Sequence, residues 1–185
     1  MKRRRFSKSG AVFSDCRKYR YALWRMWDEN KPLVMIIGLN PSTADETGND
    51  PTITRCISFA RSWRYGAVCV TNLFGFRATA PSELKAYHDP IGKENDAWVH
   101  EMAKEAAITV AAWGNHGKFL NRSVEFLSSL DQLHFIQMNK SGEPAHPLYL
   151  KAELKPFPMI SFSRLTSSFE SIISDYQQHK CLVCL

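Results

Sequence analysis

Three side chains of this 185-residue sequence stand where they could act on a bound ligand. Asn40 and Asn72 follow the apolar runs 33–37 and 67–71, and His146 lies in a later polar loop. An amide can hold a water molecule or both donate to and accept from a ligand, and an imidazole is versatile near neutral pH. No Ser-His-Asp or Cys-His pattern is recognisable. Neither the G-x-x-x-x-G-K-[ST] loop nor the G-x-G-x-x-G fingerprint is present, which argues against nucleoside triphosphate and dinucleotide binding.

The elements that must position these side chains alternate between strand and helix patterns. Four short apolar runs have the composition of buried strands, and segments with apolar residues at helical spacing separate them. This alternation predicts βαβ units, hence a three-layer α/β/α sandwich around a central, mostly parallel four-stranded sheet. Segments 10–13 and 19–27 are expected to form an edge strand or strap ahead of this core. The predicted strands are 33–37, 67–71, 107–112 and 133–137, and the predicted helices are 52–64, 93–105, 116–130 and 167–178.

A parallel sheet brings the carboxyl ends of its strands to one edge, where open α/β sheets bind their ligands. Each predicted strand is followed by a turn with a polar side chain, so these side chains should converge at that edge. The converging residues are Asn40, Asn72, Asn115, His116, Asn139 and His146.

Positive charge is concentrated at the N-terminus. The chain carries a formal net charge of +6. Residues 1–25 contain nine of its lysines and arginines but one acidic residue, Asp15. A basic arm at 1–9, with Arg3, Arg4 and Arg5, fits binding to a phosphate backbone of DNA or RNA. The alternative is a solvated tail that aids solubility.

Length and composition predict one globular domain over residues 1–185. No apolar run approaches the roughly 18–20 residues of a membrane span, and the basic N-terminus lacks the apolar stretch of a secretory signal. We therefore expect a cytoplasmic protein with no membrane association. Five scattered cysteines do not indicate a disulfide framework. Cys181 and Cys184 form a lone C-x-x-C without the second pair of a structural zinc site, so we expect no metal.

Four of these segments resemble the motifs of the uracil-DNA glycosylase superfamily, in order and in spacing. Segment 38–42 (Gly-Leu-Asn-Pro-Ser) is similar to the first motif of that superfamily, above all in its mismatch-specific branch. Segment 71–77 is similar to the thermostable branch, whose Asn reads the flipped base. Segment 111–114 resembles the Leu-Leu-Trp-Gly strand, and 146–148 the motif that contains His-Pro. The resemblance covers roughly residues 33–150 and implies a uracil-DNA glycosylase-like fold.

A narrower resemblance is to a bacterial and phage family with an Asn-Pro-Ser-Thr-Ala-Asp motif, here residues 40–45. It implies a monofunctional DNA glycosylase that flips out a pyrimidine and hydrolyses its N-glycosidic bond, leaving an abasic site. The implied role is antiviral defence against phage DNA with modified cytosine. We further expect a monomer that acts on double-stranded DNA and needs no cofactor. The aromatic residue that stacks on the base in the classical enzymes has no counterpart before Phe59. Its absence suits a larger or more polar base than uracil.

Carried over to this sequence, the resemblance implies catalytic roles for four residues. Asn40 would bind the attacking water, and His146 would donate a hydrogen bond to the departing base. Asp45 or Asp50 would act as general base or steady the cationic sugar. Each has a structural alternative: Asn40 could shape its turn, His146 could cap the residues that follow it, and the two aspartates could be turn formers or helix caps. Asp50 precedes Pro51, as an N-cap does.

The remaining assignments concern substrate and DNA contacts. Asn72 would read the base edge, and Leu148 or Tyr149 would fill the gap left by the flipped nucleotide. The expected substrate-binding residues are Gly38, Leu39, Pro41, Ser42, Asn72, Phe59 and Phe74, and the expected DNA-binding residues are Arg3, Arg4, Arg5, Arg77, Lys140, Leu148 and Tyr149.

Other functions remain open at this point. A repair glycosylase for uracil or mismatched bases would use the same chemistry. A hydrolase or base-exchange enzyme for free nucleosides or nucleotides would not need the basic arm. A non-catalytic DNA reader would keep the cavity only for recognition.

Overall fold

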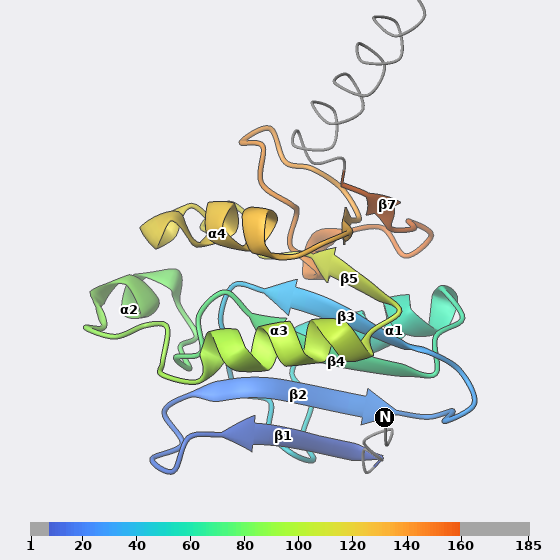
Figure 1. The fold of residues 1–185 in the computed structure, drawn as a ribbon, viewed down its shortest axis with the longest axis horizontal. Coiled ribbons are helices and arrows are strands. Elements are labelled where there is room, and N and C mark those ends of the chain that lie inside the picture. The colour runs from blue at the N-terminus through green and yellow to red at the C-terminus, as the bar shows by residue number, and fades with distance from the viewer. Residues whose placement is uncertain (1–7, 160–185) are drawn as a thin grey trace, which may run out of the picture.

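The computed structural model describes residues 8–159, which form one mixed β-sheet with helices on both faces (Figure 1). The sheet has seven strands in the order β1-β2-β4-β3-β5-β6-β7. The strands are β1 (Ser9–Phe13), β2 (Arg20–Met26), β3 (Leu33–Gly38), β4 (Ala67–Asn72), β5 (Ile108–Ala111), β6 (Leu133–Phe135) and β7 (Phe157–Pro158).

The four strands predicted from the sequence are all present, but the sheet is wider than the prediction. Strands β4, β3, β5 and β6 pair in parallel. The predicted four-stranded sheet is nevertheless wrong, because β2 and β1 extend it antiparallel beyond β4, and β7 pairs antiparallel with β6. The segments expected to form an edge strand or strap are therefore two full strands of one continuous, mixed sheet.

Strand β3 lies at the centre and is buried on both faces, as its unbroken apolar run predicted. Val34 and Ile36 face one cluster of core residues, whereas Met35 and Ile37 face the other. Burying an aliphatic side chain of this size stabilises the fold by about 1.5–3 kcal/mol. Two apolar layers thus hold the strand, and they fix where its last residues lie.

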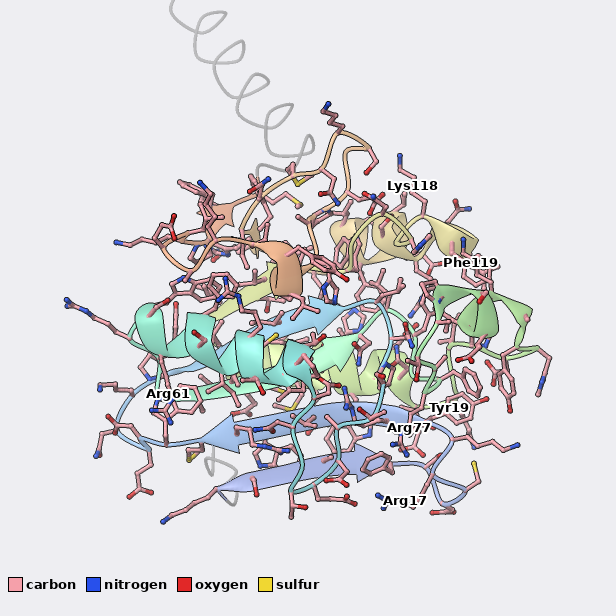
Figure 2. The ribbon with its side chains drawn as sticks, turned by 180° about the vertical axis from the view of Figure 1, so that it is seen from behind. Arg17, Tyr19, Arg61, Arg77, Lys118 and Phe119 are labelled. Atoms are coloured by element: carbon pink, nitrogen blue, oxygen red, sulfur yellow. The ribbon has the colours of Figure 1, made fainter. Side chains whose placement is uncertain are left out.

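Each apolar layer is closed by helices. On one face α1 (Pro51–Ser62) contributes Ile53, Cys56 and Phe59. On the other face lie α2 (Pro81–Ala86), α3 (Asn95–Glu105) and α4 (Arg122–Ser129). The two views show α1 and α3 on opposite sides of the sheet (Figures 1 and 2).

One predicted helix starts later than expected. The sequence predicted a helix over 116–130, but α4 begins at Arg122, after a short 3₁₀ segment, η1 (Phe119–Asn121). Leu120 and Asn121 both have positive φ, of 51° and 58°, which interrupts a right-handed helix. The predicted helix 167–178 lies outside the described residues. Between residues 8 and 159, no helix is long and apolar enough to cross a membrane.

Candidate functional site

A cavity of about 480 Å³ opens at the carboxyl edge of the parallel strands. Its walls come from the ends of β3, β4 and β5, the first turn of α1 and the 3₁₀ turn η2 (Pro147–Tyr149). The structure brings five of the six polar residues expected at this edge to the cavity, namely Asn40, Asn72, Asn115, His116 and His146, and Asp50 also lines it. Asn139 does not line the cavity; its Nδ2 donates a hydrogen bond to Asn115 Oδ1 at 2.7 Å. Gly38, Leu39, Ser42, Leu148 and Tyr149 also line the cavity, whereas Pro41 does not.

Asn40 has a structural task as well as a place at the cavity. Its Nδ2 donates hydrogen bonds to the carbonyl oxygens of Pro41 (3.0 Å) and Ala78 (2.7 Å). Because two carbonyls accept from it, the amide has one possible orientation. The amide nitrogen therefore shapes the turn, as the structural alternative predicted. Oδ1 is the atom with which a water molecule could bond.

Asn72 is a buried polar side chain that lines the cavity. It is 3% exposed, and its Nδ2 is buried without a hydrogen-bond partner within residues 8–159. Leaving a buried donor unpaired costs about 1–3 kcal/mol, so such groups usually point to a ligand or an ordered water. Asn72 Nδ2 is thus a hydrogen-bond donor that is available to a molecule bound in the cavity.

His146 lines the cavity as a neutral ring. Its Nδ1 accepts a hydrogen bond from the Leu148 backbone N–H at 3.4 Å, so it caps η2 as the structural alternative proposed. Burial lowers the pKa of His146 below its ordinary value of 6.5, and the charge of Asp50 opposes that shift. A neutral ring that accepts at Nδ1 carries its proton on Nε2. The ring can therefore donate a hydrogen bond at neutral pH.

Sequence reasoning missed Glu143, which anchors the loop that carries His146. This carboxylate is buried and accepts hydrogen bonds from Trp113 Nε1 (2.6 Å) and Ser123 Oγ (3.2 Å). One residue on, the Pro144 carbonyl accepts from Gly114 N–H at 2.8 Å. The loop is thereby fastened to the end of β5. An acid in a Gly- and Pro-containing loop carries no sequence signal that it is buried.

The two candidate aspartates differ. Asp50 lines the cavity and caps α1, where its Oδ1 accepts from Ile53 N–H at 2.8 Å. The cap leaves its other oxygen available. Asp45 does not line the cavity; its Oδ1 accepts from the Thr47 and Gly48 backbone N–H groups, which lower its pKa. The structure therefore places Asp45 in a turn, whereas Asp50 is the candidate aspartate that lines the cavity.

The two candidate stacking residues belong to the core. Phe59 is on the buried face of α1, with its ring centroid 5.2 Å from that of Trp63. Phe74 is buried on the opposite face of the sheet, with its ring centroid 5.4 Å from that of Phe119. Neither residue lines the cavity. The expectation that they bind the base is wrong, because apolar packing holds both rings away from it.

Arg20, at the start of β2, lines the cavity. Sequence reasoning had not assigned it to the site and had included it only in the positive charge of residues 1–25. The side chain is 2% exposed. Nη1 donates to the Ala44 carbonyl at 2.9 Å, and Nε has no partner among the described residues. Burial lowers the pKa of Arg20 to about 10, against the opposing charge of Asp50, so the side chain stays cationic at neutral pH.

Exposed residues surround the mouth of the cavity. Tyr149 is 84% exposed, and its ring centroid lies 5.9 Å from that of His146. A second, shallower pocket of about 430 Å³ adjoins the cavity and shares Ser42, Ala78 and Thr79 with it. Its basic residues are Arg17, Lys18 and Arg77.

The guanidinium groups of Arg17 and Arg77 lie over the ring of Phe13, 4.0 and 5.1 Å from its centroid. Figure 2 shows both arginines at one end of the sheet, with Arg61 at the other end. Lys140 is exposed on the loop before Glu143 and lines neither pocket. The expected contacts Arg3, Arg4 and Arg5, and the pair Cys181 and Cys184, lie outside the described residues.

Among residues 8–159 no group of three or more histidine, cysteine, aspartate or glutamate side chains is placed to hold a metal ion. No curated protein and no solved structure gave a significant match to this sequence. A family model described as "Protein of unknown function (DUF1643)" matches residues 20–148. That span runs from Arg20 to Leu148 and contains every residue that lines the cavity except Tyr149. The chain belongs to the DUF1643 family.

Proposed function

We propose that this protein is a monofunctional DNA glycosylase, which hydrolyses the bond between a flipped-out base and its deoxyribose. The observation that carries the proposal is the shared cavity: Asn40, Asp50, Asn72 and His146 line one space whose volume is in the range of small-ligand sites. A base must leave the double helix to reach such a space.

The proposed fold relationship is to the uracil-DNA glycosylase superfamily. Its support is that all four motif-like segments reach the cavity, through Asn40, Asn72, Trp113 and His146. Motifs that were matched by their order and spacing in the sequence are therefore neighbours in space. The exposed Tyr149 and the arginines of the second pocket support a nucleic-acid substrate rather than a free nucleoside.

In the proposed reaction the bond between C1′ and the base nitrogen breaks, and its electron pair leaves with the base. The sugar becomes cationic, water adds its oxygen to C1′, and one water proton is released. Asn40 Oδ1 accepts a hydrogen bond from that water. Asp50 stabilises the cation and takes the proton. His146 Nε2–H donates to an oxygen of the base as charge develops there.

Two further features bear on the outcome and on the substrate. Among residues 8–159, no lysine lines the cavity, so we propose hydrolysis without a Schiff base and without strand cleavage. Thr52 and Ile53 line the wall at the first turn of α1 and leave it without an aromatic ring. This wall supports a pyrimidine larger or more polar than uracil, and we propose modified cytosine of phage double-stranded DNA, excised in antiviral defence.

A non-catalytic DNA reader is the second candidate. Asn40 favours it, because both hydrogens of its amide are bound to backbone carbonyls and the residue has a complete structural role without a substrate. Such a protein would bind a flipped base through Asn72 and release nothing.

The decisive experiment measures abasic sites as alkali-labile breaks. The substrates are uracil, thymine-mismatch and unmodified DNA, and phage genomes that carry hydroxymethylated or glucosylated cytosine. Breaks in one substrate, lost in Asn40→Ala and His146→Ala but kept in the control His134→Ala, support the glycosylase and name its base. His134 lies on β6 and does not line the cavity. Tight binding without breaks supports the reader, and no binding to any DNA overturns both.

A further inference from the structure

Arg20 reaches the cavity because strand β2 contains an irregularity. Along β2, Leu23 belongs to the core layer under α1 and Ala22 to the layer under α3. Strict alternation would place Arg20 on the α3 face with Ala22. The pairing with β1, however, goes from Val12↔Ala22 directly to Phe13↔Arg20 and skips Tyr21.

The skipped residue is a β-bulge, which moves every side chain before it to the other face. Tyr21 accordingly lies beside Gly75 on the α3 side, close to Asn95. Arg20 instead lines the cavity together with Ile53 and Cys56 of α1. Bulges often re-aim a side chain next to an active site.

Within residues 8–159, no ion pair neutralises the charge of Arg20. Asp50 is the carboxylate whose charge acts on it most, yet the two form no salt bridge. Other basic groups that act on it are Arg25 and Arg77. A buried cation and a half-buried carboxylate thus line one cavity without forming an ion pair. A buried charge without a partner is unfavourable in the empty protein, and a ligand that carries one negative and one positive group would contact both.

Cleavage of a glycosidic bond creates that kind of ligand, because the sugar becomes cationic while the base becomes anionic. We propose that Arg20 stabilises the negative charge on the departing base, opposite the carboxylate of Asp50, which faces the sugar. The inference rests on the proposed function. It gives the cavity a group for each developing charge, with His146 as a neutral donor. Interactions stronger in the transition state than in the ground state accelerate the reaction.

Binding of a base anion tests this assignment without turnover. The probe is 5-nitrouracil, which is ionised near neutral pH and changes its absorption spectrum on ionisation. We expect the anion to bind, and Arg20→Gln to weaken it about 10- to 100-fold. Arg20→Lys keeps the charge and should bind with intermediate affinity. No saturable binding by the wild type, or equal affinity in Arg20→Gln, overturns the assignment.

The matched control is Arg25→Gln. Arg25 lies on the same strand and donates to the Asp45 and Gly48 carbonyls, in the same loop that Arg20 holds through Ala44. It does not line the cavity. A purely structural role for Arg20 predicts that both substitutions affect the loop and anion binding alike.

Single-turnover release separates this inference from the proposed function. In duplexes carrying the released base and its 6-aza analogue, which leaves the substituent on C5 intact, Arg20→Gln should slow release about 100- to 1,000-fold. The slowing should be smaller for the 6-aza base, because it leaves more easily as an anion. Equal slowing of both bases contradicts the role of Arg20. Release of no base by the wild type, with the anion still bound through Arg20, contradicts the glycosylase alone.

Discussion

The side chain of Asn72 occupies the space that a Cβ atom on residue 38 would need. Gly38 and Asn72 are register partners on β3 and β4, and a Cβ at Gly38 would lie 2.8 Å from Asn72 Oδ1. Contacts that short essentially never occur between real Cβ atoms and their neighbours. Because residue 38 is a glycine, the Asn72 amide at the end of β4 can occupy this position beside the cavity.

Gly38→Ala should consequently act through Asn72. We expect the amide to be displaced and DNA binding at the flipped base to weaken about 10-fold, the effect of one lost hydrogen bond. A double-mutant cycle measured by DNA titration checks this. In an Asn72→Ala background, Gly38→Ala should cost little more. Additive losses would show that Gly38 acts independently of Asn72.

Asn40→Asp should destabilise the protein. A carboxylate would face the Pro41 and Ala78 carbonyl oxygens, to which the amide now donates. We expect a loss of about 1–3 kcal/mol in the free energy of unfolding at pH 7, from urea titration. At pH values below the pKa of the new carboxyl, the protonated form can donate and part of the loss should disappear. A variant as stable as the wild type at pH 7 would refute this account of the turn.

His146 should make the free energy of unfolding decrease in mild acid. Its pKa lies below 6.5 in the folded protein, so the unfolded chain binds the proton first. The contribution of the neutral ring is therefore complete above pH 6.5 and is lost as the pH falls below it. Protonation also removes Nδ1 as acceptor for the Leu148 N–H. Urea unfolding at pH 7.5 and 5.5 should show a smaller decrease for His146→Gln than for the wild type, and equal decreases would argue against a lowered pKa.

Glu143→Ala should loosen the loop that carries His146. The substitution leaves the Trp113 N–H and the Ser123 hydroxyl without their buried acceptor. We expect about 1–3 kcal/mol of destabilisation, with base excision reduced further because His146 loses its position. Glu143→Gln retains one acceptor oxygen and should be milder. Glu153→Ala, at an exposed position, serves as control and should unfold like the wild type.

Arg77 and Tyr149 should affect DNA binding in different ways. Arg77→Ala should weaken binding and reduce the slope of log affinity against log salt by about 1, as expected for one phosphate contact. Tyr149→Ala should weaken binding by about 1–3 kcal/mol without changing that slope, because a base stacks on an uncharged ring. Fluorescence anisotropy at several salt concentrations measures both quantities. An unchanged slope for Arg77→Ala would remove it from the DNA interface.

The sequence predicted the site well where topology alone decides it. Asn40, Asn72 and His146 follow strands that are parallel, so their convergence required only the strand order and one shared edge of the sheet. The N-cap role of Asp50 was also readable, because Asp-Pro before an apolar stripe is a local signal.

The remaining features depend on packing that a single sequence does not show. Phe59 lies on the apolar face of a predicted helix, and the neighbouring sequence does not distinguish a ring that packs in the core from a ring that stacks on a base. Glu143 is buried by partners 20 and 30 residues away in the chain. Helix α4 starts late because Leu120 adopts a positive φ, a conformation that its residue type does not favour.

Because Tyr21 forms a bulge, the face to which Arg20 points depends on how many residues β1 and β2 have at this place, as well as on which residues they are. Insertion of one residue into β1, between Val12 and Phe13, would give Tyr21 a partner, restore regular pairing and turn the Arg20 guanidinium toward α3, although every cavity-lining residue would remain in the sequence. Relatives with the same motifs could therefore differ in activity through a single insertion in β1. Comparisons within the family should score the lengths of β1 and β2 together, which a motif search ignores.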